Sequence, residues 1–335
     1  MPDRHIAAIM SYSWDRLIID PTPGPRSASD FDGLVDRGGV YEVTPTAGLR
    51  TGGQSTLPRL TRHLDLPVLL MDIDAGVCGL ADQIRNAAAA FDAAEVVVVD
   101  VGGDIVAAGH EPGLRSPLAD SAALAAAVMS GLSTHVLVAG VGLDGELSAS
   151  EVDARLESLG GHQLAILTPA DVAEFKPIWS WHPSEANGLL AAAADGWRGT
   201  VETQRHTVVH LTGSATHVHK LDAENLAAST LAALLRSTTS LEQIEQLLRD
   251  QRGYSDVDIE RNRLVKRPAP RVPTAEVIDE IDRYTTDAAA RGVDALTIRR
   301  VIELVGATDT HSAGSLRQLL TSQRPNNFLP PMYLV

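Results

Sequence analysis

The sequence predicts an α/β fold: a doubly wound, mostly parallel sheet with an antiparallel edge and a C-terminal helical appendage. Short continuous apolar runs rich in Val, Ile and Leu alternate with Ala-rich stretches of helical length. This alternation is typical of a sheet with helices packed on both faces. A chain of 335 residues with 44% hydrophobic content can also bury a large core.

Five apolar runs are expected to form strands, because runs buried on both faces need not alternate with polar residues. They are residues 5–12, 66–74, 95–101, 134–142 and 162–167. Two Ala-rich stretches between them favour helices, residues 79–91 and 116–132. A further helix is expected from Pro183 to Trp197.

The pattern changes in the second half of the chain. Polar and apolar residues nearly alternate over residues 199–222, which predicts antiparallel strands at the edge of the sheet. Helical spacing of apolar residues then returns in residues 223–237, 240–251, 274–292 and 295–306. Three prolines within residues 265–273 indicate a linker. We therefore expect an α/β domain over residues 1–267 and a helical appendage over residues 268–335.

The appendage ends in the apolar tail "NNFLPPMYLV", residues 326–335. Such a tail needs a surface to pack on, either in the same chain or in a neighbouring copy. The sequence therefore also predicts a homo-oligomer.

Charge and composition narrow the class of partner. The 28 basic and 43 acidic residues give a formal net charge of -15, which repels nucleic acid and anionic lipid surfaces. No run reaches the roughly 18 apolar residues of a membrane span, and the N-terminal segment lacks a signal-peptide layout. We expect a cytoplasmic protein with a small-molecule substrate. Its single cysteine, Cys78, excludes an internal disulfide and a cysteine-cluster metal site.

Acidic residues follow three successive predicted strands. In an open parallel sheet the ligand crevice lies just beyond the carboxyl ends of the strands. Carboxylates that converge there repel one another unless a metal, basic groups or raised pKa values relieve the repulsion. Acids after strands also serve as turn formers and helix caps. The acids concerned are Asp72, Asp74, Asp100, Asp104, Asp144 and Glu146.

The last four of these acids are the candidate ligands of a divalent metal: Asp100, Asp104, Asp144 and Glu146. Oxygen ligands suit Mg²⁺ or Mn²⁺ better than Zn²⁺. Asp72 is the weakest of the six, since it fits an inward or salt-bridged position equally well. In "DVGGD", Gly102 and Gly103 either form a tight hairpin turn or let a ligand approach the backbone.

The stretch "LRSPLAD" adds a helix start to the same place. Ser116 suits the N-cap and Pro117 the first helical position, so the positive end of the helix would face the loop. An anion could bind there, which makes Ser116 and Asp120 candidate substrate-binding residues. Ordinary capping also explains Ser116.

Other candidates lie outside these strand ends. His182 in "WHPSEAN", with Glu185 and Asn187, suits a general base or a hydrogen bond to the substrate, and capping or packing explains it equally. Arg26, in the stiff loop "DPTPGPRS", fits either an anion clamp or a rigid crossover. His217 and His219 would share one face of a strand and fit a metal pair or a polar edge.

Three segments resemble the domain of unknown function 1152 family: "WDRLIIDPTPGPRS", "DVGGDIVAAGHEPGLRSPLAD" and "VGLDGEL". The likeness covers roughly residues 10 to 260. It implies a Rossmann-like fold and supplies no catalytic residues. Family members carry a further strand and a glycine-rich loop ahead of the first segment. If the start of this chain is truncated, part of a phosphate- or nucleotide-binding loop is missing.

The sequence thus favours a small-molecule enzyme that performs metal-assisted hydrolysis or group transfer on an anionic or polyhydroxylated substrate. Asp104, Glu111 and His182 are the candidate catalytic residues, with Glu111 or His182 moving protons. A non-catalytic ligand-binding or assembly protein and a nucleotide- or NAD-using enzyme are the alternatives. The chain lacks a P-loop, a complete G-x-G-x-x-G after a strand, and the G-x-S-x-G of common hydrolases.

Overall fold

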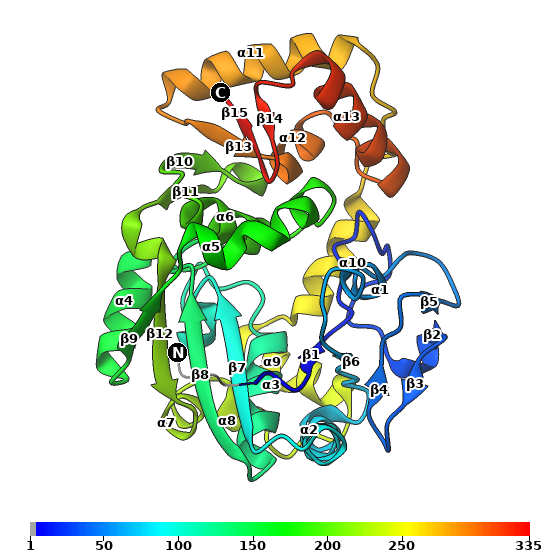
Figure 1. The fold of residues 1–335 in the computed structure, drawn as a ribbon, viewed down its shortest axis with the longest axis vertical. Coiled ribbons are helices and arrows are strands. Elements are labelled where there is room, and N and C mark those ends of the chain that lie inside the picture. The colour runs from blue at the N-terminus through cyan, green and yellow to red at the C-terminus, as the bar shows by residue number, and fades with distance from the viewer. Residues whose placement is uncertain (1–4) are drawn as a thin grey trace.

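The α/β class is confirmed by the computed structural model, which describes residues 5–335 and contains four sheets among them (Figure 1). The first four residues, which begin the segment compared with a signal peptide, lie outside that range. No helix within the described range is long and apolar enough to cross a membrane.

The central sheet has the strand order β7-β8-β12-β9. Strands β7 (Glu95–Val101) and β8 (Ser133–Ala139) pair in parallel along their whole length. Strand β12 (His217–Asp222) runs antiparallel between β8 and β9 (His162–Ile166). The polar segment expected at the edge therefore contributes an interior strand, and β7 and β8 end at the same edge.

A doubly wound arrangement is not confirmed. Helix α3 (Leu118–Met129) packs on β7, and α7 (Ala223–Ala228) packs on β8 and β12. Val99 of β7 is 62% exposed, and Val97 and residues of β9 are exposed as well. The unbroken valine run predicted burial on both faces, but alternate valines face away from the core.

A second sheet, of order β1-β6-β4-β3, lies beside the central one. Strand β6, which Asp72 and Asp74 follow in the chain, is thus not a neighbour of β7. Its strands are β1 (Ile9–Ser11), β3 (Val35–Asp36), β4 (Tyr41–Glu42) and β6 (Val68–Leu70), with β1 and β6 parallel. A small ribbon joins β2 (Phe31–Asp32) and β5 (Gly48–Leu49).

The C-terminal region is not purely helical, because it adds three strands to a sheet of order β11-β10-β13-β15-β14. Strands β10 (Gly199–Glu202) and β11 (Val208–Leu211) form the expected antiparallel pair. Strand β13 (Ala295–Thr297) then pairs in parallel with β10. The apolar tail supplies β14 (Phe328–Leu329) and β15 (Met332–Leu334). The tail therefore packs within its own chain, with Tyr333 fully buried.

Helices complete the layers. The main core lies between the central sheet and helices α2, α3, α7, α8 and α9, and it is built from Leu, Val, Ile and Ala. The remaining helices are α1 (Leu57–Leu60), α2 (Gly76–Phe91), α4 (Ala149–Ser158), α5 (Pro169–Val172), α6 (Glu185–Ala194), α8 (Ala232–Leu235), α9 (Leu241–Arg252), α10 (Asp256–Lys266), α11 (Glu276–Ala290), α12 (Ile298–Leu304) and α13 (Thr310–Gln323). The 3-10 turns are η1 (Ala28–Asp30), η2 (Asp104–Val106), η3 (Ala173–Ser180), η4 (Gln204–His206) and η5 (Gly213–Thr216).

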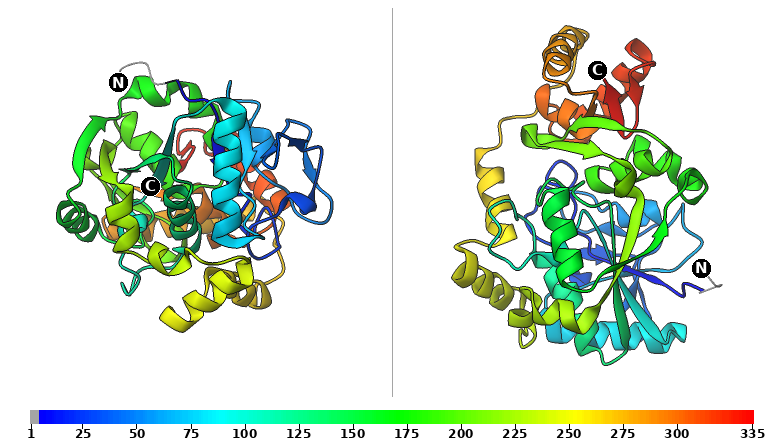
Figure 2. Two further views of the ribbon diagram at one scale, coloured as in Figure 1. Left: turned by 90° about the horizontal axis from the view of Figure 1, so that it is seen from below. Right: turned by 90° about the vertical axis from the view of Figure 1, so that its left-hand side faces the viewer.

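The C-terminal elements lie beyond the carboxyl ends of β7 and β8 (Figure 1). The chain reaches them from α10 through residues 267–274, which have no regular secondary structure. Figure 2 shows this connection running along one side of the molecule.

Candidate functional site

A cavity of about 510 Å³ opens at the carboxyl ends of β7 and β8. Its walls come from the loop after β1, the ends of β7 and β8, the start of α3, the segment before α6, and α10. The structure brings nine of the residues singled out in the sequence to this cavity: Asp100, Asp104, Ser116, Asp120, Asp144, Glu146, His182, Glu185 and Asn187.

The "DVGGD" stretch forms the floor of this cavity. Gly102 and Gly103 have φ values of 136° and 102° and lead directly into η2, so the predicted hairpin is wrong. A Cβ on Gly102 would lie 2.1 Å from Oδ2 of Asp144. Asp100 Oδ2 accepts the N–H of Gly103 at 2.7 Å. The glycines thus let the carboxylate from the β8 loop approach the end of β7.

Three carboxylates meet on this floor. One oxygen from each of Asp100, Asp104 and Asp120 lies within 4.8 Å of the others. Asp100 is 4% and Asp104 is 8% exposed. Oδ2 of Asp144 and Oδ2 of Asp256 are buried and accept no hydrogen bond from any described residue. Buried carboxylate oxygens normally have partners, so these two are open to a ligand.

The acids perturb one another. Burial, followed by repulsion from Asp120, raises the pKa values of Asp100 and Asp104 well above their ordinary range. Burial also raises the pKa of Asp120 to about 7, and that of Asp144 to about 7, with the nearby Glu146 charge adding to both. The described residues therefore do not neutralise the cluster, and a cation there would do so.

The start of α3 is already occupied by acids of this chain. Glu146 accepts N–H groups from Arg115 and Ser116 and the hydroxyl of Ser116. Asp256 Oδ1 accepts the N–H of Leu118 at 3.1 Å. Ser116 is therefore not the N-cap that the sequence suggested, and no side chain caps α3 at that position. The expected anion site at this helix end is filled by carboxylates from other elements.

Two predicted site residues do not line the cavity. Arg26 is buried and donates from Nε and Nη2 to the carboxylate of Asp20, at 2.6 and 2.8 Å. Glu111 closes its own loop by accepting the N–H groups of Ala108 and Gly109 at 2.7 and 2.8 Å. Arg26 therefore stabilises a rigid crossover loop through Asp20, and Glu111 stabilises the turn in its own loop.

The remaining predicted acids and histidines also lie elsewhere. Asp72 accepts the N–H groups of Ala28 and Asp74, at 2.7 and 3.0 Å. Neither of these two acids lines the cavity. His217 and His219 are on β12, with ring centroids 6.2 Å apart, away from the carboxylates.

Sequence reasoning missed three arginines that line the same cavity: Arg16, Arg205 and Arg263. Within residues 5–335, the side chains of Arg16, Arg205 and Arg263 have no carboxylate within 4.0 Å. Burial and the neighbouring arginines lower the pKa of Arg263 to about 10. These three arginines come from distant parts of the chain, so no local sequence pattern predicts that they lie together.

His182 lies on the wall opposite the carboxylates. Burial lowers its pKa to about 4, so the ring is neutral near pH 7. The N–H of Ser184 donates to its Nδ1 at 3.3 Å, which leaves the proton of the neutral ring on Nε2. The ring also contacts Trp179 and Trp181 edge-on. Of the two roles left open by the sequence, this favours a hydrogen-bond donor.

A family model described as "Protein of unknown function (DUF1152)" matches residues 3–264. That span includes the carboxylates, Arg16, Arg205 and Arg263, and it stops before the C-terminal strands. No curated protein matches the chain, and no solved structure does.

Proposed function

The chain belongs to the DUF1152 family, for which no function is known, and from its cavity we propose a metal-dependent enzyme that hydrolyses or transfers a group of an anionic small molecule. A phosphate ester is the substrate class that fits best. The observation that carries this proposal is the pairing of converging carboxylates with unpaired arginines in one cavity. The position at the end of the parallel pair β7–β8 is also what a Rossmann-like arrangement would give.

The carboxylate floor fits a hard divalent cation. Asp100, Asp104 and Asp120 offer three close oxygens, and the unpartnered Oδ2 of Asp144 is a fourth. An all-oxygen set suits Mg²⁺ or Mn²⁺, whereas Zn²⁺ prefers nitrogen or sulfur ligands. A cation there would also relieve the mutual repulsion of the acids.

The arginines fit the anionic part of a substrate. Arg16, Arg205 and Arg263 face the cavity without a carboxylate partner. A guanidinium presents paired donors that match phosphate oxygens. In a chain with a net charge of -15, arginines left unpaired in a cavity indicate a bound anion.

The chemistry follows from these two walls. When bound, a divalent cation would polarise a phosphoryl oxygen and acidify an attacking water. Asp144 would help to hold that cation through its unpartnered Oδ2, and the bound charge would keep this carboxylate ionised. His182 can donate a hydrogen bond from Nε2, and the arginines can hold the charge that develops in the transition state. We propose the cytoplasm as the location of this activity.

The metal site can be tested with one substitution and a matched control. Titration calorimetry with Mn²⁺ should show binding to the wild-type protein and at least about tenfold weaker binding to Asp104→Asn. Asp74→Asn also removes an acid that follows a strand, but one outside the cavity, so it should bind Mn²⁺ normally. No Mn²⁺ binding to the wild type, or equal losses in both variants, would reject the site. An assay of phosphate release from a panel of phosphate esters would then test the reaction. In that assay, Arg263→Gln should raise KM.

The close approach of Asp144 makes a second prediction. Gly102→Ala should weaken Mn²⁺ binding by about tenfold, because the new methyl group must displace the Asp144 carboxylate. Gly131→Ala is the control: Gly131 also has a positive φ, of 75°, but a Cβ there meets nothing within 4 Å. Unchanged affinity in Gly102→Ala would mean that Asp144 is not a ligand.

A further inference from the structure

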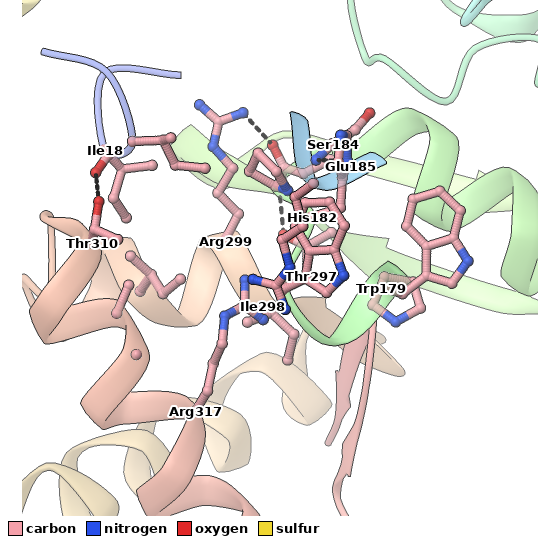
Figure 3. A pocket seen from close by; sticks show the side chains of 18 residues that line it. Ile18, Trp179, His182, Ser184, Glu185, Thr297, Ile298, Arg299, Thr310 and Arg317 are labelled. Carbon is pink, nitrogen blue, oxygen red and sulfur yellow. Dashed lines mark hydrogen bonds and ion pairs between the residues drawn. The ribbon is translucent and has the colours of Figure 1, made fainter. Parts of the chain in front are cut away.

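A second cavity, of about 200 Å³, adjoins the first between the segment before α6 and the C-terminal helices α12 and α13 (Figure 3). His182, Pro183, Ser184 and Glu185 line both cavities. The two spaces are therefore neighbouring compartments that share one wall.

The second cavity offers hydrogen-bond donors that lack partners. Nε1 of Trp179, Nε1 of Trp181 and Nη1 of Arg317 are buried and bond to no described residue. Arg317 extends from α13 toward His182 in Figure 3. Arg59 places its guanidinium 4.1 Å from the centre of the Trp181 ring. Buried donors left unpaired are costly, which points to a ligand that supplies acceptors.

Acceptors are scarce among the lining side chains. Glu185 is the one acid in this lining. Its oxygens are already engaged by the hydroxyl of Thr297, the N–H of Gln204 at 3.0 Å and Arg299 at 3.5 Å. The rest of the lining combines aromatic and apolar side chains, such as Ile298, with three arginines and three hydroxyl residues: Arg59, Arg299, Arg317, Ser184, Thr297 and Thr310. The cavity therefore suits a flat group with an aromatic face and several acceptor atoms.

We propose that this cavity holds the planar, acceptor-rich heterocycle of a substrate whose phosphate lies among the arginines of the first cavity, so that the substrate is a nucleotide. This inference rests on the proposed function. The shared wall places the Nε2–H of His182 between the two groups. Hydrogen bonds from an indole N–H and from Arg317 to its acceptor atoms, with aromatic and apolar side chains around its ring, would select the heterocycle without a glycine-rich fingerprint.

The test compares molecules that carry the same phosphate with and without the heterocycle. Calorimetry in the presence of Mn²⁺ should show AMP, GMP, CMP or UMP binding about tenfold or more tightly than ribose 5-phosphate. Equal binding of all five compounds would overturn this inference and leave the proposed function standing. Binding of none of them would reject both.

Gly314 allows the cavity to be filled without a clash. It lies on α13 in the lining, and a Cβ there meets nothing within 4 Å. Gly314→Leu should weaken nucleotide binding until it equals that of ribose 5-phosphate, whose own affinity stays unchanged. Gly314→Ala should keep most of the difference in affinity between the two ligands. Arg317→Gln should reduce it as well. If circular dichroism shows that Gly314→Leu is folded and this variant still binds the nucleotide more tightly than ribose 5-phosphate by the full factor, the heterocycle binds elsewhere and the inference is wrong.

Discussion

Raising the pH from about 5 to about 8 should destabilise the metal-free protein by several kcal/mol. Burial raises the pKa values of Asp120, Asp144 and Asp256 to about 7, whereas an unfolded Asp titrates near 4. Between these values the unfolded chain has released protons that the folded chain still holds. Stability is therefore highest on the acid side of this window and falls as the pH rises to about 7.

Other groups do not reverse this trend. Asp258, with a lowered pKa, loses its contribution only at more acidic pH. His182, with its pKa lowered to about 4, adds some stability as the pH rises from about 5 to its unfolded value near 6.5, and none above that pH. The stability gained from this one histidine is smaller than the stability lost from several acids over the same pH range. Asp100 and Asp104 shift in the same direction as the other acids and deepen the loss.

Urea unfolding at several pH values would measure this effect. Saturating Mn²⁺ should remove most of the decline, because it binds the ionised carboxylates of the folded state. Asp120→Asn should flatten the pH dependence of the metal-free protein. A metal-free protein whose stability rises steadily from about pH 5 to about pH 8 would contradict the clustering of protonated acids.

Replacing Glu202 with Ala should cost about 3–5 kcal/mol of stability. Glu202, 1% exposed on β10, accepts hydrogen bonds from Tyr284, from Arg291 at 2.7 Å and from Arg300 at 2.8 Å. Arg300 is also buried, so removing the carboxylate leaves a guanidinium in the interior with less compensation. The expected loss comes mainly from that stranded charge.

Glu303 provides the comparison for this substitution. It contacts the same arginine at 2.9 Å, but its side chain is exposed. Glu303→Ala should therefore cost less than about 1 kcal/mol in the same denaturation experiment. Similar losses for the two variants would show that burial does not decide the energetics of this network.

The site could be predicted from the sequence where chemistry and strand pattern coincide. The β7 and β8 runs were long, apolar and followed by acids, and the parallel pairing of these two strands brings Asp100, Asp104 and Asp144 together. The acids after β6 followed the same local pattern. β6 pairs with β1 instead of β7, and local sequence carries no signal for this choice of sheet.

The missed features depend on distant contacts or on very short elements. Arg16 and Arg263 meet only through the folded chain, and each alone resembles an ordinary surface arginine. Strand β13, three residues long, precedes α12 without a break, so helical spacing concealed it. Ser116 had the sequence of a cap, but Asp256 of α10 accepts the N–H of Leu118 that such a cap would bind, and the Ser116 hydroxyl donates to Glu146 instead.

The family model does not cover all the residues that line the two cavities. The family model ends at residue 264, whereas Arg299, Gly314 and Arg317 line the second cavity from beyond that point. The carboxylates of the proposed metal site thus lie within the span that the family model matches, whereas the proposed selectivity involves residues beyond it, whose sheet is joined through β10 and β13. Family members that share the carboxylates but carry a different C-terminal segment should therefore catalyse the proposed reaction on different substrates.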